Sequence, residues 1–131
     1  MMENKDLLEE LYANSSTGQF ILDAQGDILS TNRSFNRMIN QPEDLSIEGE
    51  NLVQYIFHED VDDWLFAFET FFSEEDAKTV INIRYKISNG VAWWKLYLDK
   101  IKKNEKEYII GVAVDITQEI KSQGNLLAEK K

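Results

Sequence analysis

The sequence predicts an α+β fold in which one antiparallel sheet carries helices on one of its faces. From residue 79 to residue 101, apolar and polar residues alternate in two runs, which is the period of β-strands, and a third strand-like run over residues 108–114 is apolar throughout. Between residues 61 and 72 the apolar residues instead recur every three or four positions, which is the period of a helix. Strands and helices occupy separate stretches of the chain, and this segregation favours an α+β fold over an alternating α/β one.

The first forty residues predict a helix, a hairpin and a second helix. Apolar positions at helical spacing predict a short amphipathic helix over residues 4–13. Two strand-like runs then flank a turn at residues 23–27, where Gly26 supplies the positive φ that a tight hairpin needs. Asn32 is a helix-capping residue type, and the helix that it begins ends before Pro42.

The remainder predicts one long helix and three long strands. The helix has a continuous apolar face formed by Val61, Trp64, Leu65, Phe68, Phe71 and Phe72. The strands cover residues 79–88, 91–101 and 108–114, and Asn89-Gly90 is a strong hairpin turn between the first two. Both faces of this sheet are apolar in places, so the face without helices needs a cover. We expect the N-terminal helix or a second subunit there, with these contact residues: Leu7, Leu8, Leu11, Tyr12, Trp93 and Tyr97.

Composition excludes several classes of function. The chain has 131 residues, enough for one domain with a real core, and a net charge of −10. Half of its 24 acidic residues lie between Glu43 and Asp76, where no Lys or Arg occurs. Such a surface repels a phosphate backbone, so we expect no nucleic-acid binding. The absence of cysteine excludes disulfides and cysteine nucleophiles, and no apolar run approaches the ~20 residues of a membrane helix. We therefore expect a cytoplasmic chain without membrane contact.

Four stretches in this order resemble the PAS domain, over essentially all of residues 15–120. They are "FILDAQGDILSTNRSF" (20–35), "HED" (58–60), Gly90 with Trp94 four positions later, and "GVAVDIT" (111–117). The resemblance implies a five-stranded antiparallel sheet with helices on one face, flanked by N-terminal and C-terminal helices. It also implies a sensory module that signals through dimerisation or through a helix leaving the last strand. Such modules regulate histidine kinases or cyclic-dinucleotide enzymes in longer bacterial signalling proteins.

The junction after the last strand is the expected signal relay. The resemblance identifies Asp115, Ile116 and Thr117 as the joint between the sheet and an output helix. Asp115 or Thr117 can also accept hydrogen bonds from the first free N–H groups of that helix, and a plain helix cap explains the same residues. We accordingly divide the chain into an N-terminal helix (1–14), a PAS domain (15–117) and a signalling or linker helix (118–131).

The interior of the sheet is the expected ligand pocket. The faces that should converge there carry Met38, Ile56, Trp64, Phe68, Ile83, Tyr85, Trp94 and Val112. Such a lining fits a small apolar or aromatic ligand with few polar groups, held by Tyr85 or Trp94. An aromatic stripe of this kind is also what a filled core requires. The sequence does not identify the cofactor, if there is one.

Cofactor and metal chemistry find little support in the sequence. His58 stands before the position where haem-binding PAS domains usually carry their ligand, so haem is disfavoured. Flavin photochemistry through a cysteine adduct is excluded because there is no cysteine. Acidic residues at 59, 60, 62 and 63 fit the positive end of a helix dipole as well as a divalent cation, and we predict no metal site. No acid–base pair with a nucleophile stands out, so we expect no enzyme activity in this domain.

Two functions remain open at this stage. One is a sensory domain that binds a small molecule and relays through residues 115–117. The other is a ligand-free module for homodimerisation or protein interaction, with a filled core. Both place the chain upstream of an output domain.

Overall fold

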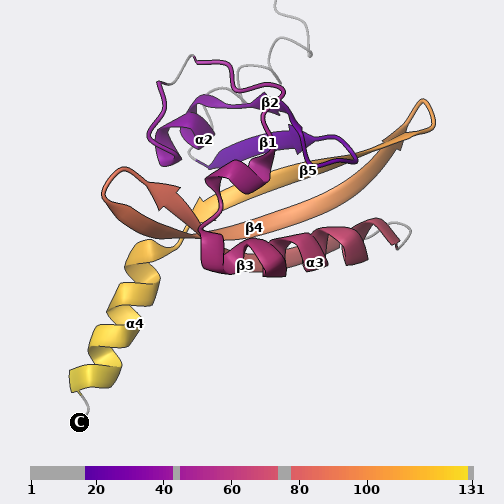
Figure 1. The fold of residues 1–131 in the computed structure, drawn as a ribbon. Coiled ribbons are helices and arrows are strands. Elements are labelled where there is room, and N and C mark those ends of the chain that lie inside the picture. The colour runs from indigo at the N-terminus through magenta and orange to yellow at the C-terminus, as the bar shows by residue number, and fades with distance from the viewer. Residues whose placement is uncertain (1–16, 43–44, 74–77, 130–131) are drawn as a thin grey trace, which may run out of the picture.

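The computed structural model describes residues 17–42, 45–73 and 78–129, and it confirms the predicted α+β class (Figure 1). The predicted helix over residues 4–13 lies outside the described residues. The elements are β1 (Gly18–Leu22), β2 (Ile28–Thr31), α2 (Arg33–Met38), the 3-10 helices η1 (Leu52–Tyr55) and η2 (His58–Asp60), α3 (Val61–Ser73), β3 (Lys78–Ile87), β4 (Gly90–Lys103), β5 (Lys106–Asp115) and α4 (Thr117–Glu129).

The five strands form one sheet in the order β2-β1-β5-β4-β3, and all neighbouring strands are antiparallel. The N-terminal hairpin therefore pairs through β1 with the last strand and not with the strands that follow it in sequence. In the central register Trp94 lies opposite both Ile83 and Asp115. The same register places Tyr97 opposite both Val80 and Val112. These two rows belong to opposite faces of the sheet, because successive side chains of a strand alternate.

The inner face of the sheet builds the core with α2 and α3. Its buried hydrophobic strand residues are Phe20, Leu22, Ile28, Ile83, Tyr85, Ala92, Trp94, Leu96, Leu98, Ile109 and Ala113. Gly111 lies among them because the Phe20 ring occupies the space that a Cβ there would need. Such a close approach requires glycine at this position of β5. It lets the Phe20 ring of the N-terminal hairpin pack directly on the backbone of the last strand.

Local capping fixes the N-terminal hairpin and α2 as the sequence predicts. Gly26 has a φ of +85°, and the side chain of Asp23 accepts hydrogen bonds from the turn N–H groups of Gln25 and Asp27. Asn32 caps α2 by accepting from the N–H of Phe35 at 3.0 Å. The Asn32 side chain also accepts from the N–H of Gln19 and donates to a backbone carbonyl. One side chain thereby joins α2 to β1.

The long helix α3 packs one face on the core, but its apolar face is narrower than predicted. Trp64 and Phe71 are buried, and Phe68 packs against the core. Leu65 was placed on the same apolar face, whereas its side chain is 50% exposed, and Phe66 is 73% exposed. The helix presents only one stripe to the core, and the exposure of Leu65 places it outside the buried part of that stripe.

The C-terminal helix α4 leaves the end of β5 and extends away from the sheet and the other helices (Figure 1). Only residue 116 separates the last strand from this helix. Among the described residues, no helix has both the length and the apolar character needed to span a bilayer.

Candidate functional site

The structure brings most of the predicted pocket residues together between the sheet and the helices. Five of them are fully buried: Ile56, Trp64, Ile83, Tyr85 and Trp94. Met38 and Phe68 are partly buried and pack against the same cluster. Val112 is the exception, because it follows Gly111 and precedes Ala113, which both face inward. Placing Val112 in the interior was wrong, since strand alternation turns its side chain to the opposite face.

A stack of aromatic rings forms the centre of this interior. The ring centroids of Tyr85 and Trp94 lie 4.0 Å apart, and the two rings are nearly parallel, at an interplanar angle of 12°. The ring of Phe35, on α2, lies with its centroid 5.4 Å from that of Trp94. Phe20 continues the row, with its ring centroid 5.3 Å from that of Phe35. The contribution of Phe35 was missed, although the helical spacing of Phe35, Met38 and Ile39 marked it as a core position.

Trp94 has one polar atom in this apolar setting. Its side chain is 0% exposed, and its indole Nε1–H has no hydrogen-bond partner. Among the residues that the structure describes, this is the one buried side-chain nitrogen or oxygen without a partner.

Tyr85 connects the aromatic stack to the end of β5. Its hydroxyl donates to Oδ2 of Asp115 at 2.6 Å. Burial, together with this hydrogen bond to a carboxylate, raises the pKa of Tyr85 far above its usual value. Burial acts to raise the pKa of Asp115 as well, but the hydrogen bonds from Tyr85 and Thr117 outweigh it and hold that pKa below its usual value. The pair is therefore a neutral phenol donating to a charged carboxylate over the whole ordinary pH range.

The same carboxylate begins α4. Oδ1 of Asp115 accepts a hydrogen bond from the N–H of Thr117 at 2.8 Å, which satisfies one of the free N–H groups of the first helical turn. Thr117 Oγ1 in turn accepts from the N–H of Trp93 at 2.9 Å, and the N–H of Ile116 donates to the carbonyl of Trp93. Residues 115–117 are thus tied to β3 through Tyr85 and to β4 through Trp93.

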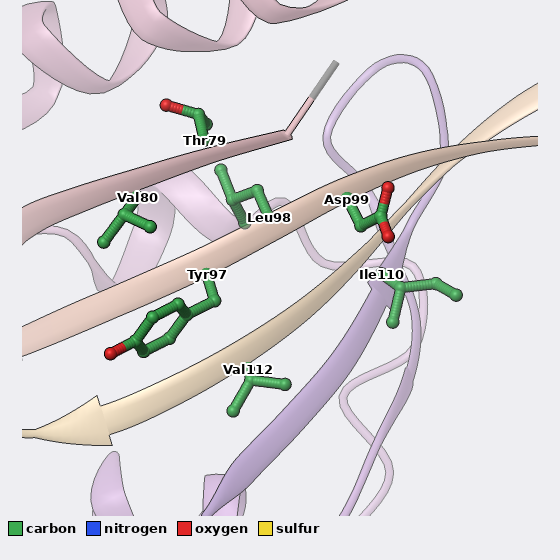
Figure 2. A pocket seen from close by; sticks show the side chains of 7 residues that line it. All are labelled: Thr79, Val80, Tyr97, Leu98, Asp99, Ile110 and Val112. Atoms are coloured by element: carbon green, nitrogen blue, oxygen red, sulfur yellow. The ribbon is translucent and has the colours of Figure 1, made fainter. Parts of the chain in front are cut away.

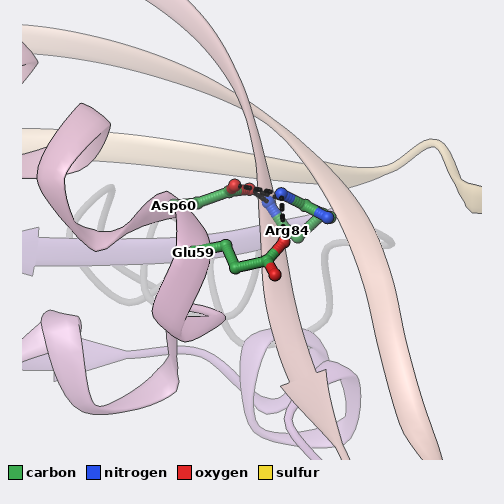
Figure 3. A network of polar contacts seen from close by, with 3 residues as sticks. All are labelled: Glu59, Asp60 and Arg84. Carbon is green, nitrogen blue, oxygen red and sulfur yellow. Dashed lines mark hydrogen bonds and ion pairs between the residues drawn. The ribbon is translucent and has the colours of Figure 1, made fainter.

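An ion pair on the other side of β3 fixes the start of α3 (Figure 3). The buried carboxylate of Asp60 accepts from the backbone N–H, Nε and Nη2 of Arg84 at 2.8, 3.0 and 2.5 Å. Glu59 lies 3.5 Å from the same guanidinium, which also covers the rings of Phe57 and Trp93. The hydrogen bonds from Arg84 hold the pKa of Asp60 below its usual value. No sequence spacing indicates this pair, because Asp60 is on η2 and Arg84 is on β3, and only the packing of η2 against β3 brings them together.

A groove of about 620 Å³ lies on the outer face of the sheet (Figure 2). Tyr97 is in its centre and is 42% exposed. Trp93 lies on the same face, half-buried beneath Arg84. The remaining lining residues are Thr79, Val80, Leu98, Asp99, Ile110 and Val112. The other predicted cover residues, Leu7, Leu8, Leu11 and Tyr12, lie outside the described residues.

The sequence matches the PAS fold family over residues 6–116, and the chain therefore belongs to the PAS family. The predicted resemblance and the five-stranded fold are both confirmed. PAS domains are sensory modules, generally non-catalytic, of signal-transduction proteins.

Three solved structures illustrate the likeness. The PAS domain of an HTR-like protein from Haloarcula marismortui is 20% identical, with a TM-score of 0.73 over 86% of this chain and 91% of that one. A PAS domain from a two-component sensor histidine kinase is 15% identical, with a TM-score of 0.67 over 83% and 93%. The PAS domain of the quorum-sensing receptor RpfR from Cronobacter turicensis, in complex with BDSF, is 19% identical, with a TM-score of 0.65 over 79% and 97%. At such identities the likeness shows the fold. No curated protein matches the sequence.

Proposed function

We propose that this chain senses a small molecule between its sheet and its helices and relays the signal through residues 115–117 to α4. The hydrogen bond from Tyr85 to Asp115 is the observation that most supports this proposal. It joins a ring of the buried interior to the residue that caps the helix leaving the domain.

The proposed relay works by a change in hydrogen bonding at the end of β5. A ligand that moves the Tyr85–Trp94 stack also moves the hydroxyl that holds Oδ2 of Asp115. Oδ1 of the same carboxylate holds the first turn of α4, so the direction of this helix depends on where the carboxylate lies. A ligand that favours a displaced position of the Asp115 carboxylate over the present one therefore shifts the population of α4 directions.

The family gives this proposal its setting. One neighbour of the same fold comes from a two-component sensor histidine kinase, and another is in complex with BDSF. We place this chain in the same class of arrangement: a cytoplasmic, non-enzymatic homodimer with residues 15–117 as sensor and residues 118–131 as relay to a histidine kinase or cyclic-dinucleotide enzyme.

Native mass spectrometry of the freshly purified protein, followed by denaturation in the same instrument, tests the sensor proposal. A mass excess that disappears on denaturation is the expected result. If the native protein has only its chain mass, or only that of a dimer, across preparations from several growth conditions, the sensor proposal is wrong.

Spin labels test the relay, because a chain without cysteine accepts them at chosen sites only. Labels at Asn82→Cys on β3 and Ser122→Cys on α4 report the direction of the helix relative to the sheet. We expect Asp115→Ala to broaden or shift their distance distribution, while Glu119→Ala in the same helix turn leaves it unchanged. A loss of thermal stability without any change in that distribution contradicts the relay.

The outer groove supports a second function, that of a ligand-free interaction module. Val80, Tyr97 and Ile110 each expose two fifths or more of their side chains on that face. The sheet thus offers a contiguous apolar surface on which a second subunit can pack. A clean dimer mass without any bound molecule is the result that favours this function.

A further inference from the structure

Among the residues that the structure describes, the interior between the sheet and the helices contains one buried side-chain donor without a hydrogen-bond partner. This donor is Nε1–H of Trp94, whose side chain is fully buried and which lacks a partner in the part of the chain that the structure describes. Trp94 lies at the centre of the ring stack, between Phe35 on α2 and Tyr85 on β3. The donor is therefore in the middle of the proposed sensor and not at its rim.

The other buried polar side chains show how unusual this donor is. Asn32 and Asn36 bond to backbone groups, and Asp60 accepts from Arg84. Ser34 accepts a hydrogen bond from the guanidinium of Arg37. Buried polar groups in native proteins are nearly always paired, because removal from water without a new partner is unfavourable. The Trp94 indole thus has an unmet requirement for an acceptor that the described residues do not supply.

The surroundings of Trp94 define the chemistry of that acceptor. The rings beside it are apolar, and the hydroxyl hydrogen of Tyr85 is already donated to Asp115. The guanidinium of Arg84 lies over Trp93 and is paired with Asp60, so it does not neutralise an interior anion. A charged carboxylate would thus be buried without a counter-ion, whereas a neutral oxygen fits a single N–H donor.

We infer that the interior binds a small uncharged molecule, largely aromatic or aliphatic, whose carbonyl or ether oxygen accepts the hydrogen bond from Trp94 Nε1–H. This inference rests on the proposed sensory function and gives its ligand a chemical class. It also separates two roles that the sequence left together: Trp94 holds the ligand, and Tyr85 transmits to Asp115. A ligand seated on Trp94 touches the relay directly, because Trp94 and Tyr85 are stacked.

Acetophenone and ethylbenzene test this class, because they differ only in that acetophenone has a carbonyl group where ethylbenzene has a methylene. Each is titrated into the ¹⁵N-labelled chain while the indole N–H signals of its three tryptophans are followed. These signals are assigned with Trp64→Phe and Trp93→Phe variants. We expect acetophenone to move the Trp94 signal downfield and to bind about tenfold more tightly than ethylbenzene, which corresponds to about 1.4 kcal/mol. Benzoate is expected to bind more weakly than acetophenone.

The variant Trp94→Phe keeps a ring and removes the donor, and in it the preference for acetophenone should disappear. Since this variant can lose stability, the wild-type titration decides the question by itself. Equal binding of the two probes, with the Trp94 signal unmoved, overturns the acceptor class but leaves a sensor of another chemistry. Binding of neither probe overturns the inference as well. If native mass spectrometry also finds no bound molecule, the proposed sensory function is wrong as well.

Discussion

At the scale of single residues, the hydroxyl of Tyr85 is the smallest group whose removal should uncouple α4 from the core. Tyr85→Phe keeps the ring that stacks on Trp94 and deletes only the donor to Asp115. We expect a loss of about 1–2 kcal/mol in the free energy of unfolding, since hydrogen bonds to charged groups are worth about 1.5–3 kcal/mol and water partly replaces this one. Amide hydrogen exchange should accelerate at Thr117 and in the turn that follows.

Tyr97→Phe is the matched control for that experiment, because Tyr97 lies exposed on the other face of the sheet. It should change neither stability nor exchange in α4. Faster exchange throughout the sheet in Tyr85→Phe would mean that the hydroxyl supports the whole fold and does not act specifically on the junction.

The pair of Asp60 and Arg84 predicts a dependence of stability on pH. Because Arg84 lowers the pKa of Asp60 in the folded state, the pair contributes its full stability above the unfolded pKa of about 3.9. This contribution is lost as pH falls through the lower folded pKa. We expect Asp60→Asn to cost about 2–3 kcal/mol at pH 7 and progressively less below pH 4, measured by urea unfolding.

Asp62→Asn removes an exposed carboxylate from the first turn of α3 and serves as the control. It should cost less than about 0.5 kcal/mol at pH 7. A difference between wild type and Asp60→Asn that stays constant from pH 7 to pH 3 would show that the ion pair is not its origin.

At the scale of elements, β1 and β5 pack closely at Gly111. Of the glycines described on the strands, Gly111 has the least room for a Cβ. A Cβ at position 111 would overlap the Phe20 ring, so Gly111→Ala forces that ring out of its place. We expect a loss of about 2–3 kcal/mol in the free energy of unfolding, which is the usual cost of overpacking a core. The double variant Gly111→Ala with Phe20→Leu should be more stable than the sum of the single effects predicts, by 1 kcal/mol or so. If the effects of the two substitutions on the free energy of unfolding, measured in urea, are strictly additive, the cost of Gly111→Ala does not come from overlap with the Phe20 ring.

Elements also show where reading the sequence succeeded. The hairpin at Gly26, the cap at Asn32 and the long strands around Asn89-Gly90 were predicted correctly, because each depends on residues close in sequence. Strand alternation likewise assigned Ile83, Tyr85 and Trp94 to the inner face. Val112 was assigned wrongly, since its parity along β5 depends on the register that Gly111 and Phe20 set together, and the two are far apart in sequence.

At the scale of the whole molecule, long-range partners were what the sequence did not predict. Tyr85 was named as a ligand contact, yet its hydroxyl is committed to Asp115, thirty residues away. Arg84 holds Asp60 across twenty-four residues, and no pattern in the sequence indicated that contact. Both bonds depend on the sheet order and on where η2 meets β3. Contacts of this kind produce no periodic pattern in the sequence, so a single sequence does not predict them.

The outer face of the sheet leads to a prediction about assembly. We expect the chain to dimerise through this face, and in a two-fold dimer each substitution on it acts twice. Tyr97→Glu places two carboxylates against the apolar residues around the groove, Val80, Ile110 and Val112. Sedimentation velocity should then show a monomer where wild type shows a dimer, while the melting temperature of each subunit changes little. Phe66→Glu adds the same charge at an exposed apolar position on α3 and should leave the dimer intact. A wild-type chain that sediments as a monomer at high concentration, or a Tyr97→Glu dimer, would show that the outer face does not join two copies of this chain.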